Sequence, residues 1–239
     1  GTMAETSEIK ANFQGVTGRI KEAVKKAKLE KEPTLVAVSK TKPNEAITEA
    51  YELGHRHFGE NYVQELVKKS KELPSDIKWH FIGHLQSNKA KMVVGVPNLE
   101  MLETVDSVKL ANTLNRICGE MKRKLNVLVQ VNTSGEQQKY GVPPSGCVEM
   151  VRHVVEKCPN LVFGGLMTIG DYSPTPKPDC FASLVKCREA VEEKLKIDMS
   201  TKQMSMGMSA DFELAIEMGS TSVRVGSALF GARQYKKKS

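Results

Sequence analysis

The feature that most constrains the fold is a regular alternation of short apolar runs with amphipathic segments. Each run is rich in β-branched or other apolar residues and is bounded by turn signals, as strands are. The eight runs are Thr34–Lys40, His55–Asn61, Lys78–Gly83, Leu99–Val105, Leu125–Thr133, Leu161–Ile169, Gln203–Ser209 and Ser222–Phe230. We expect each run to form one strand of a single sheet.

The segments between these runs have the spacing and the ends of helices. Gly54, Pro74 and Gly219, for example, stand where three of them should stop. Strands that alternate with helices pair in parallel through crossovers, and eight of them can close a (β/α)8 barrel. The predicted helices are Glu8–Leu29, Glu45–Leu53, Tyr62–Leu73, Leu85–Val94, Ser107–Lys122, Pro144–Cys158, Phe181–Leu195 and Ala210–Met218.

A closed barrel explains the chain better than an open doubly wound sheet does. The open sheet usually carries a glycine-rich loop after its first strand, but the residues from Ser39 to Pro43 contain no glycine. The length of 239 residues suits one barrel. We therefore predict a single α/β domain over residues 1–239, with an extra N-terminal helix, a tag remnant at 1–2 and a basic tail at 236–239.

Charge and composition limit the partners. Lys and Arg number 35 against 28 Asp and Glu, but this excess is spread over the first helix and the tail, and only 5% of residues are aromatic. We expect no nucleic-acid partner, although a weak acidic partner stays open. No run approaches the ~18 apolar residues of a membrane span, and no secretory signal is visible. A cytoplasmic protein is expected, with association to mitochondria as an alternative.

Cysteine and histidine spacings indicate neither a disulfide scaffold nor a metal site. The five cysteines are odd in number and form no CxxC pair. Two histidine pairs, His55 with His57 and His80 with His84, lack a neighbouring motif that would complete a metal site. We therefore expect reduced thiols and no bound metal.

Lys40 is the first candidate functional residue. Active sites of such barrels lie at the carboxyl ends of the strands, and Lys40 ends the first run on the same face as Val36 and Val38. Burial lowers the pKa of a lysine, and an amine tuned in this way attacks aldehydes. The alternative is a lysine whose ammonium reaches solvent at the barrel rim.

The ends of the seventh and eighth runs suggest a phosphate site beside Lys40. Ser209, expected to cap a helix from about Ala210, and Gly226-Ser227 offer hydroxyls and open backbone N–H groups. Barrels frequently bind phosphate here, although glycines that merely form turns are the alternative. A ligand with an aldehyde and a phosphate would span both sites, and pyridoxal 5′-phosphate is such a ligand.

Arg224 lies two residues before Gly226, on the same strand face. From there it could face the pyridine nitrogen of such a ligand and keep that nitrogen unprotonated, because arginine does not release its own proton. An unprotonated ring is a weaker electron sink. The alternative for Arg224 is an ion pair at the barrel rim.

At these residues the sequence resembles the pyridoxal phosphate homeostasis protein family, also called the proline synthase co-transcribed or YggS-type family. The segments NTSGEQQKYG and SMGMSADF are similar to its eukaryotic branch. The matching stretches are Val36–Pro43, His57–Glu65, Trp79–Lys89, Gly165–Gly170, Ser205–Ile216 and Val223–Gly231.

This resemblance implies a barrel similar to the alanine racemase N-terminal domain and a monomer. It implies that Lys40, and not Lys42, forms the Schiff base with pyridoxal 5′-phosphate and that Arg224 faces the pyridine nitrogen. It further implies a phosphate site at Ser209, Gly226 and Ser227, and a pocket lined by Asn61, His80, Met167 and Met208. The implied role is vitamin B6 homeostasis without established turnover, with apo-enzymes that use the cofactor as candidate recipients.

Three other functions remain as alternatives. The first is an amino-acid racemase-like enzyme, which needs acid–base groups on both faces of the substrate carbon. We expect the second base to be absent, because alanine racemases take it from a separate C-terminal β-domain and this sequence ends soon after the eighth run. The other two are a lysine-dependent aldolase acting on a sugar phosphate and a nucleic-acid-binding protein. Because the expected role is without established turnover, no catalytic residue is assigned.

Overall fold

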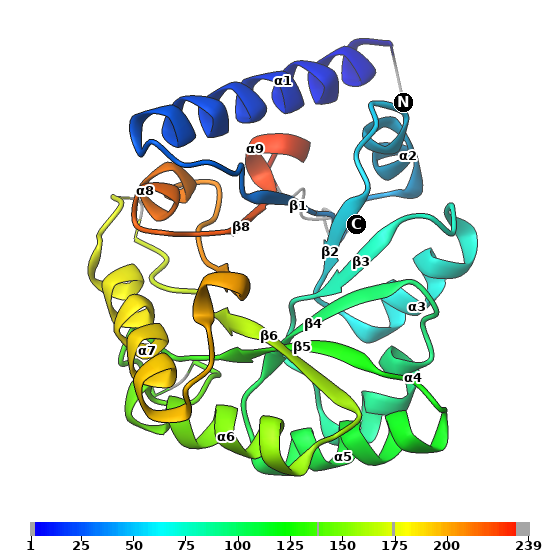
Figure 1. Cartoon of the computed structure of the whole chain (residues 1–239). Helices are drawn as coiled ribbons and strands as arrows, with labels where there is room; N and C mark the ends of the chain where they lie inside the picture. The colour runs from blue at the N-terminus through cyan, green and yellow to red at the C-terminus, as the bar shows by residue number, and fades with distance from the viewer. Residues whose placement is uncertain (1–2, 138, 174, 233–239) are drawn as a thin grey trace.

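The computed structural model describes residues 3–137, 139–173 and 175–232, so the expected tag remnant at 1–2 and tail at 236–239 lie outside it. Within these ranges eight parallel strands close into a barrel in the order β1 to β8 (Figure 1). Strands β8 and β1 are hydrogen-bonded neighbours. The strands are β1 Thr34–Val38, β2 His57–Glu60, β3 Lys78–Phe81, β4 Leu99–Val105, β5 Leu125–Gln130, β6 Leu161–Met167, β7 Gln203–Ser205 and β8 Ser222–Val225. The prediction of a (β/α)8 barrel is confirmed.

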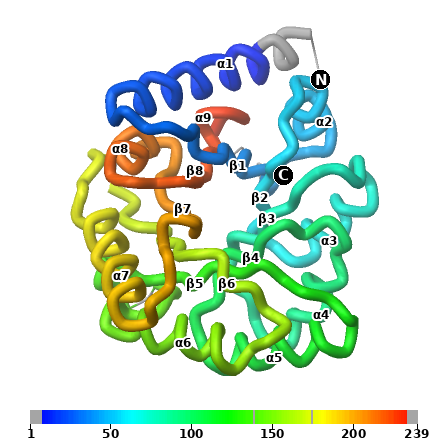
Figure 2. Tube along the Cα trace, in the orientation of Figure 1, coloured from blue at the N-terminus to red at the C-terminus, as the bar shows by residue number. Residues whose placement is uncertain are grey.

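Helices surround this barrel (Figure 2). The expected segment Leu85–Val94 splits into a 3₁₀ turn at Ser87–Lys89 and a short helix, while Ser107 caps its helix by accepting a bond from the Leu110 N–H. The helices are α1 Met3–Lys26, α2 Asn44–Glu52, α3 Val63–Glu72, α4 Ala90–Val94, α5 Val108–Glu120, α6 Cys147–Lys157, α7 Asp179–Leu195, α8 Phe212–Glu217 and α9 Ser227–Phe230. No helix in the described part of the chain is both long and apolar enough to cross a membrane.

Helix α1 is the addition to the eight strand–helix units. It packs across α2, α8 and α9, as Figure 1 shows. The helix buries Phe13, Val16, Ile20 and Ala23, which recur at helical spacing on one face. Its partners come from both ends of the chain, so α1 covers the side on which β8 meets β1.

The two faces of the strands have different chemistry. Residues that face the helices, such as Phe58, Trp79 and Phe81, belong to one continuous apolar core. The opposite face fills the barrel interior and includes buried polar side chains, among them His80, Glu103 and Arg224. Because strand side chains alternate between faces, the interior of the barrel could become polar without disturbing the outer core.

Several strands end earlier than the apolar runs predicted. Strand β1 stops at Val38, β7 at Ser205 and β8 at Val225. After β7 the chain turns at Gly207, where φ is +105° and an added Cβ would lie 2.7 Å from the Cβ of Ala215, so only glycine fits. The residues that follow therefore lie in loops across the mouth of the barrel.

Candidate functional site

A cleft with a volume of about 390 Å³ opens at the carboxyl ends of β1, β7 and β8. Residues from three distant parts of the chain, within 38–42, 171–173 and 208–231, meet here because β8 closes the barrel against β1. Six of the nine residues expected at the site line it: Lys40, Met208, Ser209, Arg224, Gly226 and Ser227.

The other three expected residues, Asn61, His80 and Met167, are not among the described residues that line this cleft. His80 lies in the barrel interior, bonded to His57 and Glu103. Met167 is fully buried in β6. Asn61 follows β2, and its backbone packs on Gly83, where an added Cβ would come within 2.0 Å of the Asn61 carbonyl oxygen. These three residues were expected from the family resemblance alone, which does not give the height of a side chain in the barrel.

Lys40 occupies a turn whose flanking residues are held by α3 and β2, Ser39 by both elements and Thr41 by α3. The Lys69 ammonium donates to the Ser39 carbonyl oxygen at 2.8 Å, and the Ser39 hydroxyl donates to Glu60 at 2.7 Å. On the other side, the Thr41 N–H donates to Glu65 at 2.5 Å, with Thr41 at a φ of +65°. The backbone that carries Lys40 is therefore fixed on both sides.

The three groups that hold this turn form a buried ion cluster. Lys69 donates to Glu60 at 2.7 Å and to Glu65 at 2.6 Å, and the side chain of Lys69 is only 6% exposed. Burial raises the pKa of Glu60 to about 7, although the charge of Lys69 opposes the rise. No motif in the sequence pointed to this cluster. Its signal was a lysine on the apolar face of α3, three residues after Leu66.

The expected phosphate end is built by two loops that are joined to each other. Ser209 does not cap a helix: α8 begins at Phe212, and the Ser209 hydroxyl accepts the Ala228 N–H at 3.2 Å. This expectation was wrong because the Asp211 carboxylate accepts the Met208 N–H at 2.7 Å and holds the loop open for two more residues. Ser209 consequently links the β7 loop to the first turn of α9.

Arg224 connects the cleft to the barrel interior. Arg224 is 4% exposed, and its guanidinium donates to the Ser205 hydroxyl at 2.5 Å and to the Thr168 carbonyl oxygen at 2.6 Å. Burial lowers the pKa of Arg224, and the charges of Glu103 and Asp211 oppose that change. An arginine remains charged under such conditions, so the cleft has a fixed positive charge at its base.

Lys42 differs from Lys40 in its setting. Its ammonium points to the carbonyl oxygens of Gly231 and Ala232, at 3.4 and 3.5 Å, at the end of the described chain. Burial lowers the pKa of Lys42. Both lysines line the cleft, so proximity by itself does not separate them.

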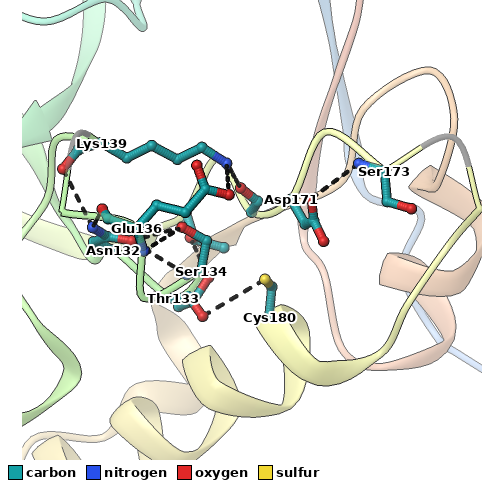
Figure 3. A network of polar contacts seen from close by, with 10 residues as sticks. Asn132, Thr133, Ser134, Glu136, Lys139, Asp171, Ser173 and Cys180 are labelled. Carbon is teal, nitrogen blue, oxygen red and sulfur yellow. Dashed lines mark hydrogen bonds and ion pairs between the residues drawn. The ribbon is translucent and has the colours of Figure 1, made fainter.

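A tyrosine also lies at this cleft. Tyr172 lines it and is 69% exposed, with the Lys139 ammonium 4.6 Å from its ring centroid. Lys139 donates to the Gly170 carbonyl oxygen at 3.1 Å and pairs with Glu136, which ties the β5 and β6 loops together (Figure 3). No motif in the sequence indicated that this loop lines the cleft.

Comparisons with known proteins agree on one family. Residues 14–234 match the family described as "Alanine racemase, N-terminal domain". A human protein named pyridoxal phosphate homeostasis protein is 48% identical over 100% of this chain and 91% of its own length. One of the same name from Pasteurella multocida is 40% identical over 96% of this chain and 99% of its own. The higher identity to the human protein agrees with the expected eukaryotic branch.

The solved structures include PipY from Synechococcus elongatus with pyridoxal phosphate bound. It is 34% identical, covers 89% of this chain and 100% of its own, and superposes with a TM-score of 0.73. Sequence identity and fold therefore point the same way. The chain belongs to the pyridoxal phosphate homeostasis protein family, within the alanine racemase N-terminal domain fold.

Proposed function

We propose that this protein binds pyridoxal 5′-phosphate in the cleft between β1, β7 and β8 and acts as a carrier or regulator in vitamin B6 homeostasis. The observation that carries the proposal is that Lys40, Arg224 and the Gly226-Ser227 turn line one cleft. Its volume of about 390 Å³ lies within the range of small-ligand pockets. The cofactor bound to the PipY relative supports the same reading.

The proposal gives each end of the cleft a separate task. The Lys40 amine condenses with the cofactor aldehyde and releases water, which attaches the cofactor covalently. Ser209 and the Gly226-Ser227 backbone hold the phosphate. Arg224 donates toward the pyridine nitrogen and keeps it unprotonated. Asn61, His80 and Met167 are not assigned to the pocket.

Lys40 rather than Lys42 is proposed as the attachment point because its turn is held rigidly by Lys69 and Glu65. Borohydride reduction of the loaded protein should leave pyridoxyl mass on the peptide that contains Lys40. The matched variants are Lys40→Ala, which should lose the mass, and Lys42→Ala, which should keep it. Mass that follows Lys42 would contradict the assignment, and no mass on either lysine would contradict covalent binding.

The carrier role rests on a cleft that stays open to solvent, as the 69% exposed Tyr172 at its rim indicates. An open site suits release of the cofactor to a recipient enzyme more than it suits a reaction that must exclude water. We expect a monomeric cytoplasmic protein that transfers its cofactor to an apo-enzyme. The test mixes loaded protein with such an apo-enzyme and measures recovered activity. Recovery no faster than with free cofactor would contradict the role.

Tyr172 keeps a racemase-like enzyme as a second candidate, because it brings a phenol to the same cleft as Lys40. The measurement is the rate at which solvent deuterium enters the Cα of L- and D-alanine. A carrier should show negligible exchange. Fast exchange with loss of chirality that falls ~10²–10⁴-fold in Tyr172→Phe would establish the enzyme instead.

A further inference from the structure

The barrel interior contains a continuous chain of polar contacts that ends on Arg224. His57 Nδ1 lies 2.9 Å from His80 Nε2, and His80 Nδ1 lies 2.8 Å from Glu103 Oε2. The Ser205 hydroxyl joins the other carboxylate oxygen, Glu103 Oε1, at 2.5 Å, and Arg224 donates to that hydroxyl. These five residues, the interior chain, come from β2, β3, β4, β7 and β8.

The chemistry of the side chains fixes the direction of nearly every bond in the interior chain. Arginine has only donors, so the Ser205 oxygen accepts from Arg224 and its proton goes to Glu103. Glu103 accepts this bond and can therefore accept another from the His80 Nδ1–H. Both ends of the interior chain thus donate toward one ionised carboxylate, whether His80 is neutral or protonated.

Glu103 and Arg224 are 1% and 4% exposed, so their charges are separated from water. A buried charge is costly unless it is paired and hydrogen-bonded. Burial by itself would raise the pKa of Glu103, but the hydrogen bond and charge of His80, with Arg224 and Ser205, hold that pKa below its ordinary value. Glu103 is consequently the counter-charge of Arg224, and the Ser205 hydroxyl connects the two side chains.

The opposite end of the interior chain reaches a small cavity at the amino-terminal end of the strands. His57, His80 and Glu103 line it together with Glu100, and its volume is about 70 Å³. His57 faces His80 and Lys78 on β3, Glu103 on β4, and His55. Burial and then the positive charges of His80, Lys78 and His55 lower the pKa of His57 to about 4, against the charge of Glu103. A neutral His57 can donate its Nδ1–H to His80 Nε2.

We propose that Glu103, held in place by His80, is a positioning residue for Arg224. Through Ser205 it sets the orientation of the guanidinium and offsets its charge, and it thereby tunes the action of Arg224 on a bound pyridine ring. The effect on the ring rests on the function proposed above. The hydrogen bonds of the interior chain belong to the protein alone.

The first experiment uses the protein without cofactor and so does not depend on the proposed function. Nitrogen-15 NMR of labelled histidines reports which ring nitrogen carries the proton. We expect His80 to be protonated at Nδ1 from pH 5 to pH 8, and this signal to change in Glu103→Gln. A His80 protonated only at Nε2 would overturn the proposal, because that tautomer cannot donate to Glu103.

The second experiment follows the visible absorbance of the protein-bound cofactor against pH. In Glu103→Gln the charge of Arg224 is no longer offset, so protonation of the bound cofactor beside that charge becomes harder. The midpoint should move to lower pH by about 1 to 3 units, the usual size of a nearby charge effect. Glu100→Gln removes a carboxylate from the same strand and cavity but not from the interior chain, and should leave the midpoint unchanged.

Ser205 provides variants that keep both charges. Ser205→Ala interrupts the interior chain and should shift the midpoint in the same direction. Ser205→Thr keeps the hydroxyl and should have the midpoint of the wild type. An equal midpoint in wild type, Glu103→Gln and Ser205→Ala would overturn the positioning role while the cofactor site stands. Failure of the wild type to bind the cofactor would remove the proposed function, and the NMR result would still decide the interior chain.

Discussion

The two cations at the cleft, Lys40 and Arg224, are held in opposite ways. Lys40 is held through its backbone, by the Glu60–Lys69–Glu65 cluster on the helix side of the sheet. Arg224 is held through its side chain, by Ser205 and Glu103 inside the barrel. A reacting amine needs a fixed backbone that directs it toward the ligand, whereas a charge that only faces a ring works best when its side chain is fixed.

The largest expected effect comes from removing the support of Lys40. Lys69→Met should lower the free energy of unfolding by about 3–5 kcal/mol, because it leaves Glu60 buried without its partner. Urea denaturation measures this change. The double variant Lys69→Met with Glu60→Gln is the control, and it should recover much of the loss. If it recovered nothing, the cluster would not be the source of stability.

Next in size is the pH dependence of stability that Glu60 creates. Its pKa is about 7 when folded, above the ordinary value of 4.5. A raised pKa means that the folded state binds the proton more tightly, so stability is lost as pH rises from about 4.5 through 7. Glu60→Gln should remove a loss of up to ~3 kcal/mol.

The measurement for Glu60 is the difference in unfolding free energy between variant and wild type at several pH values. His55 and His57 act in the opposite direction, because a pKa of about 4 in each folded histidine means that stability is lost as pH falls below about 6.5. Both proteins share these histidines, so their contribution cancels in the difference. A pH-independent difference would contradict the raised pKa of Glu60.

On the Arg224 side the comparison predicts an effect on binding more than on stability. Arg224→Lys keeps the charge, but one ammonium cannot reproduce the fork that reaches both Ser205 and Thr168. The ammonium therefore loses the proposed hydrogen bond to the pyridine nitrogen. Loss of one hydrogen bond from a charged group costs about 1.5–3 kcal/mol, so cofactor affinity should fall roughly 10- to 100-fold. Fluorescence titration measures the affinity. Unchanged affinity would mean that only the charge of Arg224 matters.

The smallest expected effect is at the joint between the two phosphate loops. Ser209→Ala removes the bond to the Ala228 N–H, a neutral hydrogen bond of about 0.5–1.5 kcal/mol. Affinity for pyridoxal 5′-phosphate should fall by about 2- to 10-fold, while affinity for pyridoxal, which lacks the phosphate, should hardly change. An equal fall for both ligands would place the phosphate elsewhere.

The sequence by itself determined the barrel and most of the cleft. Eight apolar runs separated by helical segments leave few ways to bury the strands, and parallel strands all end at one mouth. Lys40, Ser209, Arg224 and Gly226 therefore had to approach one another once β8 paired with β1. No pairwise contact had to be known for this step, because chain order and strand direction are enough.

Only the tertiary structure decided how these residues are held. The family resemblance implied His80 in the pocket, but the structure places it in the interior chain, because strand position alone does not give the height of a side chain in the barrel. Lys69 reaches a carbonyl group 30 residues earlier, and Ser205 meets a carboxylate 102 residues earlier. Contacts at such separations depend on the register and closure of the sheet, which no local pattern of residues records.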